Sequence, residues 1–500
     1  MKSLAPWTVI RQRAQAAGTG LAAVILLILA HIVPVQAADE KVSPRTLSAA
    51  QFHQGVQLAW RKIVDRHPAP FRIHSKARYE AEVTRMMQRA SDISEARAFI
   101  EMSRLIGMLP DGHNWVSVDD NSLLFSKAVQ LRFWQFADGL YVRAAAPSQA
   151  SLLGAKVVTI GGMPIAEAWT LIRNAVGGGE QISTTRAQIY VEIPAFLEAL
   201  GLAPSDNEVV LGLILRDGTA TTKTIRAKQY ENYSDVWNTS AQWTTPENWL
   251  EPDGAKRALW FARRDVAFWS TYLADSRSLY VAFNKATIDP DNPWNPKDDK
   301  LRPFLTELFK RTQSDDVDRL IIDLRNNNGG DSALWQPLVH HIIRAERLFA
   351  PGRLFVITSR LTESAAVAWA AKINMHSPAL FVGEATVNPP NFDNDPAGRR
   401  RESYHIPGSA VNFRIANMIE YWSDSGDDRD ALYPDIPVSM RWSDFINGHD
   451  PALLAIAGVS LAAAKGYLVD ADGNSTAEYP WTNYRRKSQV EAMKRARTPR

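Results

Sequence analysis

The segment from residue 317 to 334 constrains the fold of this protein most, because it joins a buried strand to a helix through a pair of glycines. Residues 320–324 are mainly apolar and rich in isoleucine and leucine, which favours a buried strand. Gly329 and Gly330 follow three asparagines, and glycine accepts the backbone angles of a tight turn. Polar residues after the glycines can cap a helix over 333–345. The turn therefore predicts convergent backbone N–H groups, as in an anion site or an oxyanion hole.

The second half of the sequence alternates between strand-like and helix-like segments. Apolar, β-branched runs predict strands at 278–284, 320–325, 353–359 and 379–386, and apolar positions three or four residues apart predict helices at 301–313, 332–345 and 363–374. This alternation is typical of an α/β core with mostly parallel strands.

The first half has a different pattern. Residues 47–109 repeat apolar positions at helical spacing, whereas the period shortens towards two from residue 123, as in strands. We expect a small β-rich, PDZ-like module there, and then a segment in which five tryptophans cover a surface through packing rather than form a ligand platform. The predicted division is 1–37 signal peptide, 38–122 helical domain, 123–232 PDZ-like domain, 233–270 Trp-rich insertion or linker, 271–468 α/β catalytic core and 469–500 basic tail.

The first 37 residues have the features of an export signal. Lys2, Arg11 and Arg13 precede an apolar run over 21–33, and Val35-Gln36-Ala37 is a small-residue cleavage pattern. The run is short for a bilayer span, which favours cleavage over a retained anchor. We therefore expect a periplasmic or secreted protein without a stable membrane span, membrane-anchored only if the signal stays uncleaved.

Charge and composition exclude several classes of function. The formal net charge is +3, and the signal carries three cations and no acid, so the rest of the sequence has a formal net charge of zero. The basic footprint of a nucleic-acid binder is therefore absent. The sequence has no cysteine, which excludes disulfides, thiolate catalysis and zinc–cysteine sites. No Gly-Lys-Ser/Thr follows the glycine pair, and no cluster has metal-ligand spacing. We expect neither a cofactor nor a metal.

Ser364 is a candidate nucleophile. It stands at the predicted start of a helix of small residues, where serine commonly serves only as a cap. In the alternative interpretation its hydroxyl reacts, and the Ala365 N–H and the helix dipole stabilise an oxyanion.

His113 is the candidate base. It lies in the turn Asp111-Gly112-His113-Asn114, where a histidine can be a plain surface residue or the base that a serine needs at neutral pH. His340 and His341 lie inside an apolar helix without a metal-binding spacing, and we interpret them as core or surface residues.

Several motifs together resemble one family. Asp323-Leu324-Arg325 with the Asn–Gly-Gly turn resembles the Leu-Arg-x-Asn-x-Gly-Gly signature of the tail-specific (C-terminal processing) and tricorn-type serine peptidases, and Thr362-Glu363-Ser364 resembles their nucleophile segment. Further landmarks occur in the family's order: Asp111-Gly112-His113, Leu153-Gly154-Ala155, Ile160-Gly161-Gly162, Gly383-Glu384, Pro390-Asn391, Tyr433-Pro434-Asp435-Ile436 and Gly448-His449-Asp450-Pro451. The resemblance covers most of residues 47–465 and implies a ClpP/crotonase-like α/β core.

The resemblance also implies roles for individual residues. Ser364 would attack an acyl carbon, His113 would take its proton, and N–H groups of Gly329 or Gly330 and of Ala365 would form the oxyanion hole. The Ser–Lys branch is excluded, because Asn388-Pro389-Pro390 stands where that branch has its lysine, and Lys372 lies about 12 Å along the helix from Ser364. Val367 stands where the family often has glutamate.

The acid that orients His113 is open at this stage. Family position points to the stretch before the Pro-Asp-Ile motif, where the competing carboxylates are Glu420, Asp424, Asp427 and Asp428, and we favour Glu420.

The sequence thus predicts an exported serine hydrolase, most simply a peptidase, that acts on peptide or protein substrates. Recognition of the C-terminal ends of these substrates is one expected mode of binding. Two alternatives stay open: a catalytically inactive protein of the same fold that binds peptides or their ends, and an esterase that acts on a non-peptide substrate.

Overall fold

The computed structural model describes residues 41–109, 111–240, 243–292, 296–395, 402–460, 468–469 and 485–486. The predicted signal peptide and nearly all of the basic tail lie outside the described residues. Residues Ser43–Arg500 form one compact unit, to which all the elements below belong. Within the described part of the protein, no helix is both long and apolar enough to cross a bilayer.

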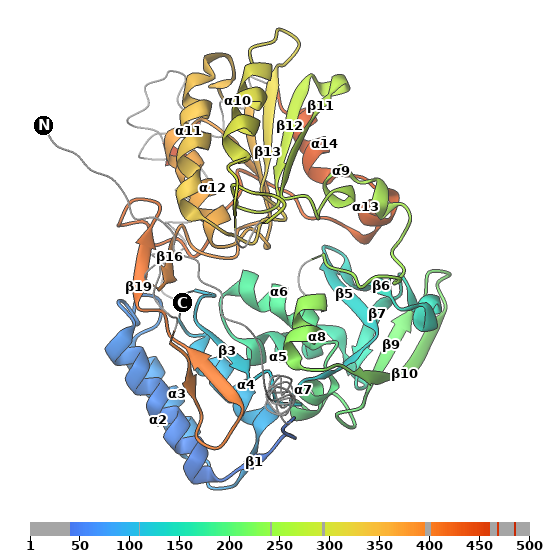
Figure 1. The fold of residues 1–500 in the computed structure, drawn as a ribbon. Coiled ribbons are helices and arrows are strands. Elements are labelled where there is room, and N and C mark those ends of the chain that lie inside the picture. Colours follow the sequence, from blue (N-terminus) through green and yellow to red (C-terminus); the bar gives the residue numbers. More distant parts are fainter. Residues whose placement is uncertain are drawn as a thin grey trace, which may run out of the picture. The chain divides into compact units, whose positions relative to one another are not determined.

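A six-stranded sheet forms the α/β core (Figure 1). Its first strand is antiparallel to its neighbour and the other neighbours run parallel, as the alternation of strands and helices predicts. In spatial order the strands are β11 (Phe268–Leu273), β12 (Ser278–Phe283), β13 (Arg319–Asp323), β14 (Leu354–Thr358), β15 (Leu380–Gly383) and β20 (Ile436–Pro437).

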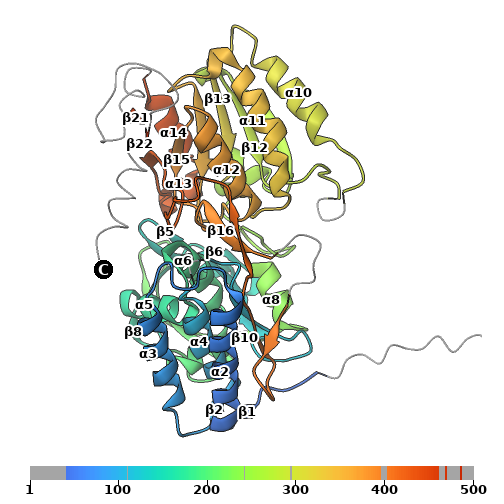
Figure 2. The ribbon, with the colours of Figure 1, turned by 90° about the vertical axis from the view of Figure 1, so that its left-hand side faces the viewer.

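Helices cover both faces of this sheet. Successive side chains of a strand point to opposite faces, so the apolar strands bury side chains on both sides. Leu320 and Ile322 of β13 belong to the apolar cluster that α10 (Leu301–Arg311), α11 (Trp335–Arg344) and α12 (Ala365–His376) close. Ile321, between them, belongs to the cluster on the other face, together with α14 (Pro451–Gly458). Figure 2 shows α10, α11 and α12 along the sheet.

Three helices begin the compact unit: α2 (Ala49–Arg66), α3 (Lys76–Met87) and α4 (Glu95–Ile106). Each begins after a serine whose side chain accepts a hydrogen bond from the third helical N–H, and these caps are Ser48, Ser75 and Ser94. Such caps satisfy N–H groups that have no partner within the helix and fix where each helix starts.

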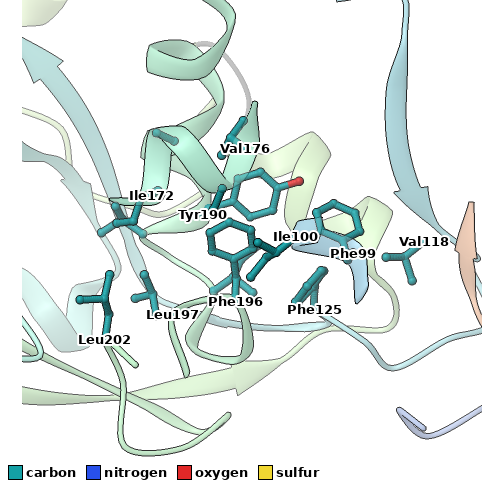
Figure 3. Close-up of a cluster of buried hydrophobic side chains, with 14 of the residues drawn as sticks. Phe99, Ile100, Val118, Phe125, Ile172, Val176, Tyr190, Phe196, Leu197 and Leu202 are labelled. Carbon is teal, nitrogen blue, oxygen red and sulfur yellow. The ribbon is translucent and has the colours of Figure 1, made fainter. Parts of the chain in front are cut away.

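A β-rich module follows. Its sheet has the order β4-β10-β9-β7-β6-β5, with β8 on β7. The strands are β4 (Lys127–Val129), β5 (Leu131–Phe136), β6 (Gly139–Ala145), β7 (Lys156–Ile160), β8 (Met163–Pro164), β9 (Glu208–Ile214) and β10 (Ala220–Gln229), and the helices are α5 (Ile165–Val176), α6 (Glu180–Tyr190) and α7 (Pro194–Ala199). One apolar cluster joins this module to α2, α3 and α4, and Figure 3 shows part of it around Phe99, Phe125 and Phe196.

A late segment of the sequence packs against the first helices. β18 (Val411–Arg414) pairs with β17 (Tyr404–His405) on one side and with β3 (Trp115–Val118) on the other. Ile406 and Phe413 are fully buried in the same cluster as α2 and α4. The sequence analysis places residues 404–414 inside a continuous catalytic core. In the structure β18 instead pairs with β3, almost 300 positions earlier in the sequence. Composition cannot reveal such a contact.

Three of the five tryptophans of 233–270 are buried and serve packing, as expected: Trp243, Trp260 and Trp269. Trp237 instead lines a cavity that is described below. After α8 (Tyr233–Ser240), Trp243 and Trp260 are buried in one cluster with Trp134, Trp442 and Phe445. The indoles of Trp134 and Trp243 stack with ring centroids 3.9 Å apart.

Replacement of Phe413 by alanine should destabilise the compact unit by about 3–5 kcal/mol, because it empties a fully buried site between β18 and the first helices. Urea denaturation measures this change. Tyr421→Ala, at a side chain that is 55% exposed, is the control and should change the free energy of unfolding by less than about 0.5 kcal/mol. Equal effects of the two changes would show that the β3–β18 contact adds little stability.

Candidate active site

Ser364 occupies a strained turn between β14 and α12. Its φ of 54° and ψ of −122° lie outside the regions that L-residues prefer. Its side chain makes no capping hydrogen bond to the helix, so the cap interpretation does not hold. The Ser364 N–H donates to Asn388 Oδ1 at 2.8 Å. The hydroxyl group, which caps nothing, has a different partner.

That partner is His113, which lies in the loop between α4 and β3. Its Nε2 is 3.3 Å from Ser364 Oγ, although the two residues are 251 positions apart. The imidazole is only 8% exposed and stacks on Phe392, with the ring centroids 5.3 Å apart. A buried, stacked ring has little freedom to turn, so the contact with Ser364 is held in place.

Asp111 holds the other nitrogen of the ring. Its Oδ1 lies 2.5 Å from His113 Nδ1 and accepts the His113 N–H at 2.7 Å. Its Oδ2 accepts a hydrogen bond from Asn388 Nδ2 at 2.7 Å. Asn388 therefore bridges the backbone of the serine and the acid, and it lies at the position where the Ser–Lys branch has its lysine. Asn388 is fully buried.

These surroundings shift the pKa of His113. Burial favours the neutral ring and lowers the pKa, but the charge of Asp111 and its hydrogen bond outweigh burial. The net result is a pKa above the ordinary value of 6.5. The His113 ring therefore binds a proton more tightly than the ring of a free histidine.

The structure does not bring Glu420 to His113. The Glu420 carboxylate accepts hydrogen bonds from Asn394 Nδ2 at 2.9 Å and Trp422 Nε1 at 2.8 Å. Among the competing acids, Asp427 forms an ion pair with Arg429 at 2.6 Å, and Asp424 and Asp428 are exposed. Position in the family therefore pointed to the wrong carboxylate. The sequence did contain a signal for Asp111, which stands two residues before His113, because an aspartate side chain readily bonds to the backbone two residues on.

The glycine pair lies against the serine. A Cβ atom added at Gly329 would stand 2.8 Å from Ser364 Cβ and 3.3 Å from the Ala365 nitrogen, and the φ of Gly329 is 110°. The Gly329 N–H itself donates to Asn327 Oδ1 at 2.9 Å. Among the described residues, the Gly330 and Ala365 N–H groups have no acceptor, and Ala365 is the first residue of α12, where N–H groups have no helical partner.

Two more ionisable groups belong to this region. Glu363 directly precedes Ser364, and Lys285, which no sequence pattern singled out, interacts with the charge of Glu363. Glu363 is partly buried beside His113, and burial raises the pKa of its carboxyl group. Burial lowers the pKa of Lys285 to about 8, and its Nζ donates to Asn328 Oδ1 at 2.8 Å.

A cavity of about 550 Å³ opens beside His113 and Glu363. It extends between β3 and helices α6 and α8, and Arg186 and Arg360 also line it. This volume lies within the range of small-ligand pockets in enzymes.

The remaining candidates lie away from this site. Lys372 is on α12, where its ammonium group lies 5.5 Å from the ring centroid of Trp335. His341 stacks on Phe309 and His340 is exposed. Within the described ranges no three histidine or carboxylate side chains are grouped to hold a metal ion.

Comparison with known proteins supports the fold. No family model matches the sequence, and no curated protein matches it either. A serine-to-alanine mutant of CPAF superposes with a TM-score of 0.55 at 11% identity, over 80% of this protein and 95% of CPAF. Mature CPAF complexed with lactacystin gives 0.52 at 11% identity, over 82% and 97%. The tricorn protease gives only 0.34 at 14% identity, over 82% of this protein and 36% of tricorn, too low to carry an argument.

At these identities the likeness establishes the fold. The protein shares the α/β fold of CPAF. The resemblance to the tail-specific peptidases stays an expectation from the sequence motifs. The predicted domain boundaries are not tested by this likeness and stay predictions.

The close approach of Gly329 to Ser364 has a measurable consequence. Gly329→Ala adds a Cβ atom at positive φ against Ser364 Cβ and should displace the hydroxyl, which lowers its rate of reaction with a fluorophosphonate about 100-fold, as expected for a misplacement near 1 Å. Gly426→Ala is the control, because nothing lies within 4 Å of the added atom. Equal labelling rates for the two variants would mean that the site tolerates a side chain at residue 329.

Proposed function

We propose that this protein is an exported serine hydrolase, most simply a peptidase, with Ser364 as nucleophile and His113 as general base. The observation that carries the proposal is the 3.3 Å contact between His113 Nε2 and Ser364 Oγ, made by residues from opposite halves of the sequence. Serine is a weak nucleophile at neutral pH and needs such a base within hydrogen-bonding reach.

In the proposed reaction, Ser364 Oγ attacks the carbonyl carbon of the scissile bond while its proton passes to His113 Nε2. The tetrahedral intermediate collapses, the acyl group stays on Oγ, and the leaving amine takes the proton from His113. A water molecule then attacks the acyl carbon, gives its proton to His113, and the carboxylic acid departs as Oγ is reprotonated.

We assign the orienting role to Asp111 in place of Glu420. Its carboxylate at His113 Nδ1 fixes the tautomer in which Nε2 accepts the serine proton, and it stabilises the imidazolium that forms. Asn388 is a positioning residue, because it links this carboxylate to the Ser364 N–H.

We assign the oxyanion hole to the N–H groups of Ala365 and Gly330. Both lack acceptors among the described residues, and the Ala365 N–H lies at the positive end of α12. Gly329 serves by leaving room, since its own N–H is held by Asn327.

A peptide substrate is favoured by the ordered set of motifs that resembles those of the serine peptidases. The inactive binding protein is disfavoured because a non-catalytic descendant has no need to hold the serine at positive φ against a buried histidine. The charged start, apolar run and small-residue pattern of residues 1–37 support export to the periplasm or the medium.

A fluorophosphonate probe tests the nucleophile. We expect the purified protein to be labelled, Ser364→Ala to abolish labelling, and His113→Ala to slow it by at least about 100-fold, since general-base catalysis is worth about 10² to 10⁴. His340→Ala, at an exposed histidine of α11, is the matched control and should label like the wild type. The readout is in-gel fluorescence against time.

Absence of labelling in a protein shown to be folded by circular dichroism would refute the hydrolase and favour a binding protein. Digestion of a peptide library, compared with hydrolysis of p-nitrophenyl esters, separates the peptidase from the esterase. Cleavage of esters alone would assign the protein to the second class.

The pH profile tests Asp111. His113 acts as a base only when neutral, so the rate should fall as the pH falls through its pKa, with the acid limb of kcat/KM above pH 6.5 in the wild type. Asp111→Asn removes the charge that raises the pKa, so the limb should move to lower pH while kcat falls about 10³- to 10⁴-fold. Glu420→Gln is the control and should leave the limb in place. A limb that moves with Glu420→Gln instead would return the orienting role to Glu420.

A further inference from the structure

β3 is an edge strand with a free side. In the described sheet it pairs only with β18, with Trp115 opposite Arg414 and Ser117 opposite Asn412. The Asp119 N–H donates to the Ala410 carbonyl at 2.9 Å, which continues the same register. Antiparallel partners exchange hydrogen bonds at every second residue, so residues 115, 117 and 119 face β18.

The backbone groups of Val116 and Val118 therefore point away from β18. Neither N–H has an acceptor among the described residues. An unpaired row of N–H and C=O groups on an edge strand is a template for another extended segment.

This free edge lies on the cavity of the candidate active site. All four residues of β3 line that cavity, which also reaches His113 and Glu363. His113 is three residues before Val116 in the sequence, so the free edge of β3 starts next to the loop that carries His113. The cavity is thus continuous from the serine's surroundings along the strand.

The part of the cavity lining that comes from α6 and α8 is mainly apolar and aromatic. Ile182, Ile189 and Tyr190 come from α6, and Tyr233 and Trp237 come from α8. Figure 3 shows Val118, Val176 and Tyr190, three residues of the buried apolar cluster that also line the cavity. A wall of this kind binds apolar side chains, whereas the β3 edge binds backbone.

We propose that the substrate binds by strand addition: an extended peptide pairs with the free edge of β3 and places every second side chain against the wall formed by α6 and α8. This inference rests on the proposed function for its link to cleavage, but strand addition itself is a binding property. In this binding mode the main-chain hydrogen bonds give affinity and alternate pockets give specificity.

The geometry fixes which part of the peptide pairs. Three residues of strand span about 10 Å, so the groups of Val116 and Val118 bind peptide residues about three to five positions from the scissile bond. The preferred sequence there has apolar residues, Leu or Phe, at alternate positions. A substrate truncated within two residues of the scissile bond on that side would lose the contact.

Binding to the Ser364→Ala protein tests the inference without catalysis. The probe is a fluorescein-labelled decapeptide in which Leu or Phe alternates with Lys or Glu, read by fluorescence anisotropy. N-methylation of single peptide bonds should weaken binding by at least tenfold at alternate positions and by less than twofold at the positions between, because only every second peptide group faces the strand. A peptide of the same composition with its apolar residues grouped in one block should bind at least tenfold more weakly.

The strand is tested from the protein side by Val116→Pro and Val116→Ala. Both lose the valine side chain, but only proline removes the N–H, and that N–H does not pair with β18, so the sheet can accept the change. Val116→Pro should bind the decapeptide at least tenfold more weakly than Val116→Ala. Both variants are made in the Ser364→Ala protein, and equal circular dichroism spectra and equal midpoints of thermal unfolding show that both are folded.

The outcomes separate the two proposals. An N-methyl scan without a two-residue period, no measurable binding of the decapeptide, or equal binding by the two Val116 variants overturns strand addition, whatever the labelling result. Periodic binding by a protein whose Ser364 does not react with fluorophosphonate supports strand addition and refutes the hydrolase.

Discussion

The buried carboxylate of Asp111 is the group on which the site depends. It is 2% exposed, and burial of an anion without partners is strongly unfavourable. Its two oxygens are satisfied by the His113 backbone and ring and by the side chain of Asn388. Those bonds position the His113 ring, and Asn388 in turn holds the backbone of Ser364. The solvation requirement of one carboxylate thus brings together three segments that are far apart in the sequence.

The loop that carries His113 is fixed from its other side by Asn114. Asn114 Nδ2 donates to Asp393 Oδ2 at 2.8 Å, and Asn114 Oδ1 accepts the Ala416 N–H at 2.8 Å. Asp393 also contacts His67 at 2.8 Å, with both side chains fully buried. The same late segment supplies β18, which pairs one side of β3 and leaves the other side on the cavity. The proposed base His113, its loop and the proposed substrate edge are therefore fixed by contacts to one late segment of the sequence.

Much of the architecture followed from local patterns. Apolar runs with helical or two-residue periods predicted β12 to β15 and α10 to α12, because those patterns report which side chains are buried. Ser364 and the glycine pair were found because a strand, a turn and a helix follow one another within a few residues. Glu420 was chosen by position in a family, and the structure places its carboxylate on Asn394 and Trp422. The pairing of β18 with β3 left no signal, because a four-residue strand is the same in sequence whichever partner it takes.

The sequence by itself determined the elements of the core, the turn at Gly329 and Gly330, and the candidates Ser364 and His113, since each depends on residues within about one turn of its own position. Only the tertiary structure decided that His113 Nε2 lies 3.3 Å from Ser364 Oγ, that Asp111 is the carboxylate at its other nitrogen, and that β3 has a free edge on the cavity. Those facts depend on packing and on the solvation of buried charge, which couple residues hundreds of positions apart and leave no period or spacing in the sequence.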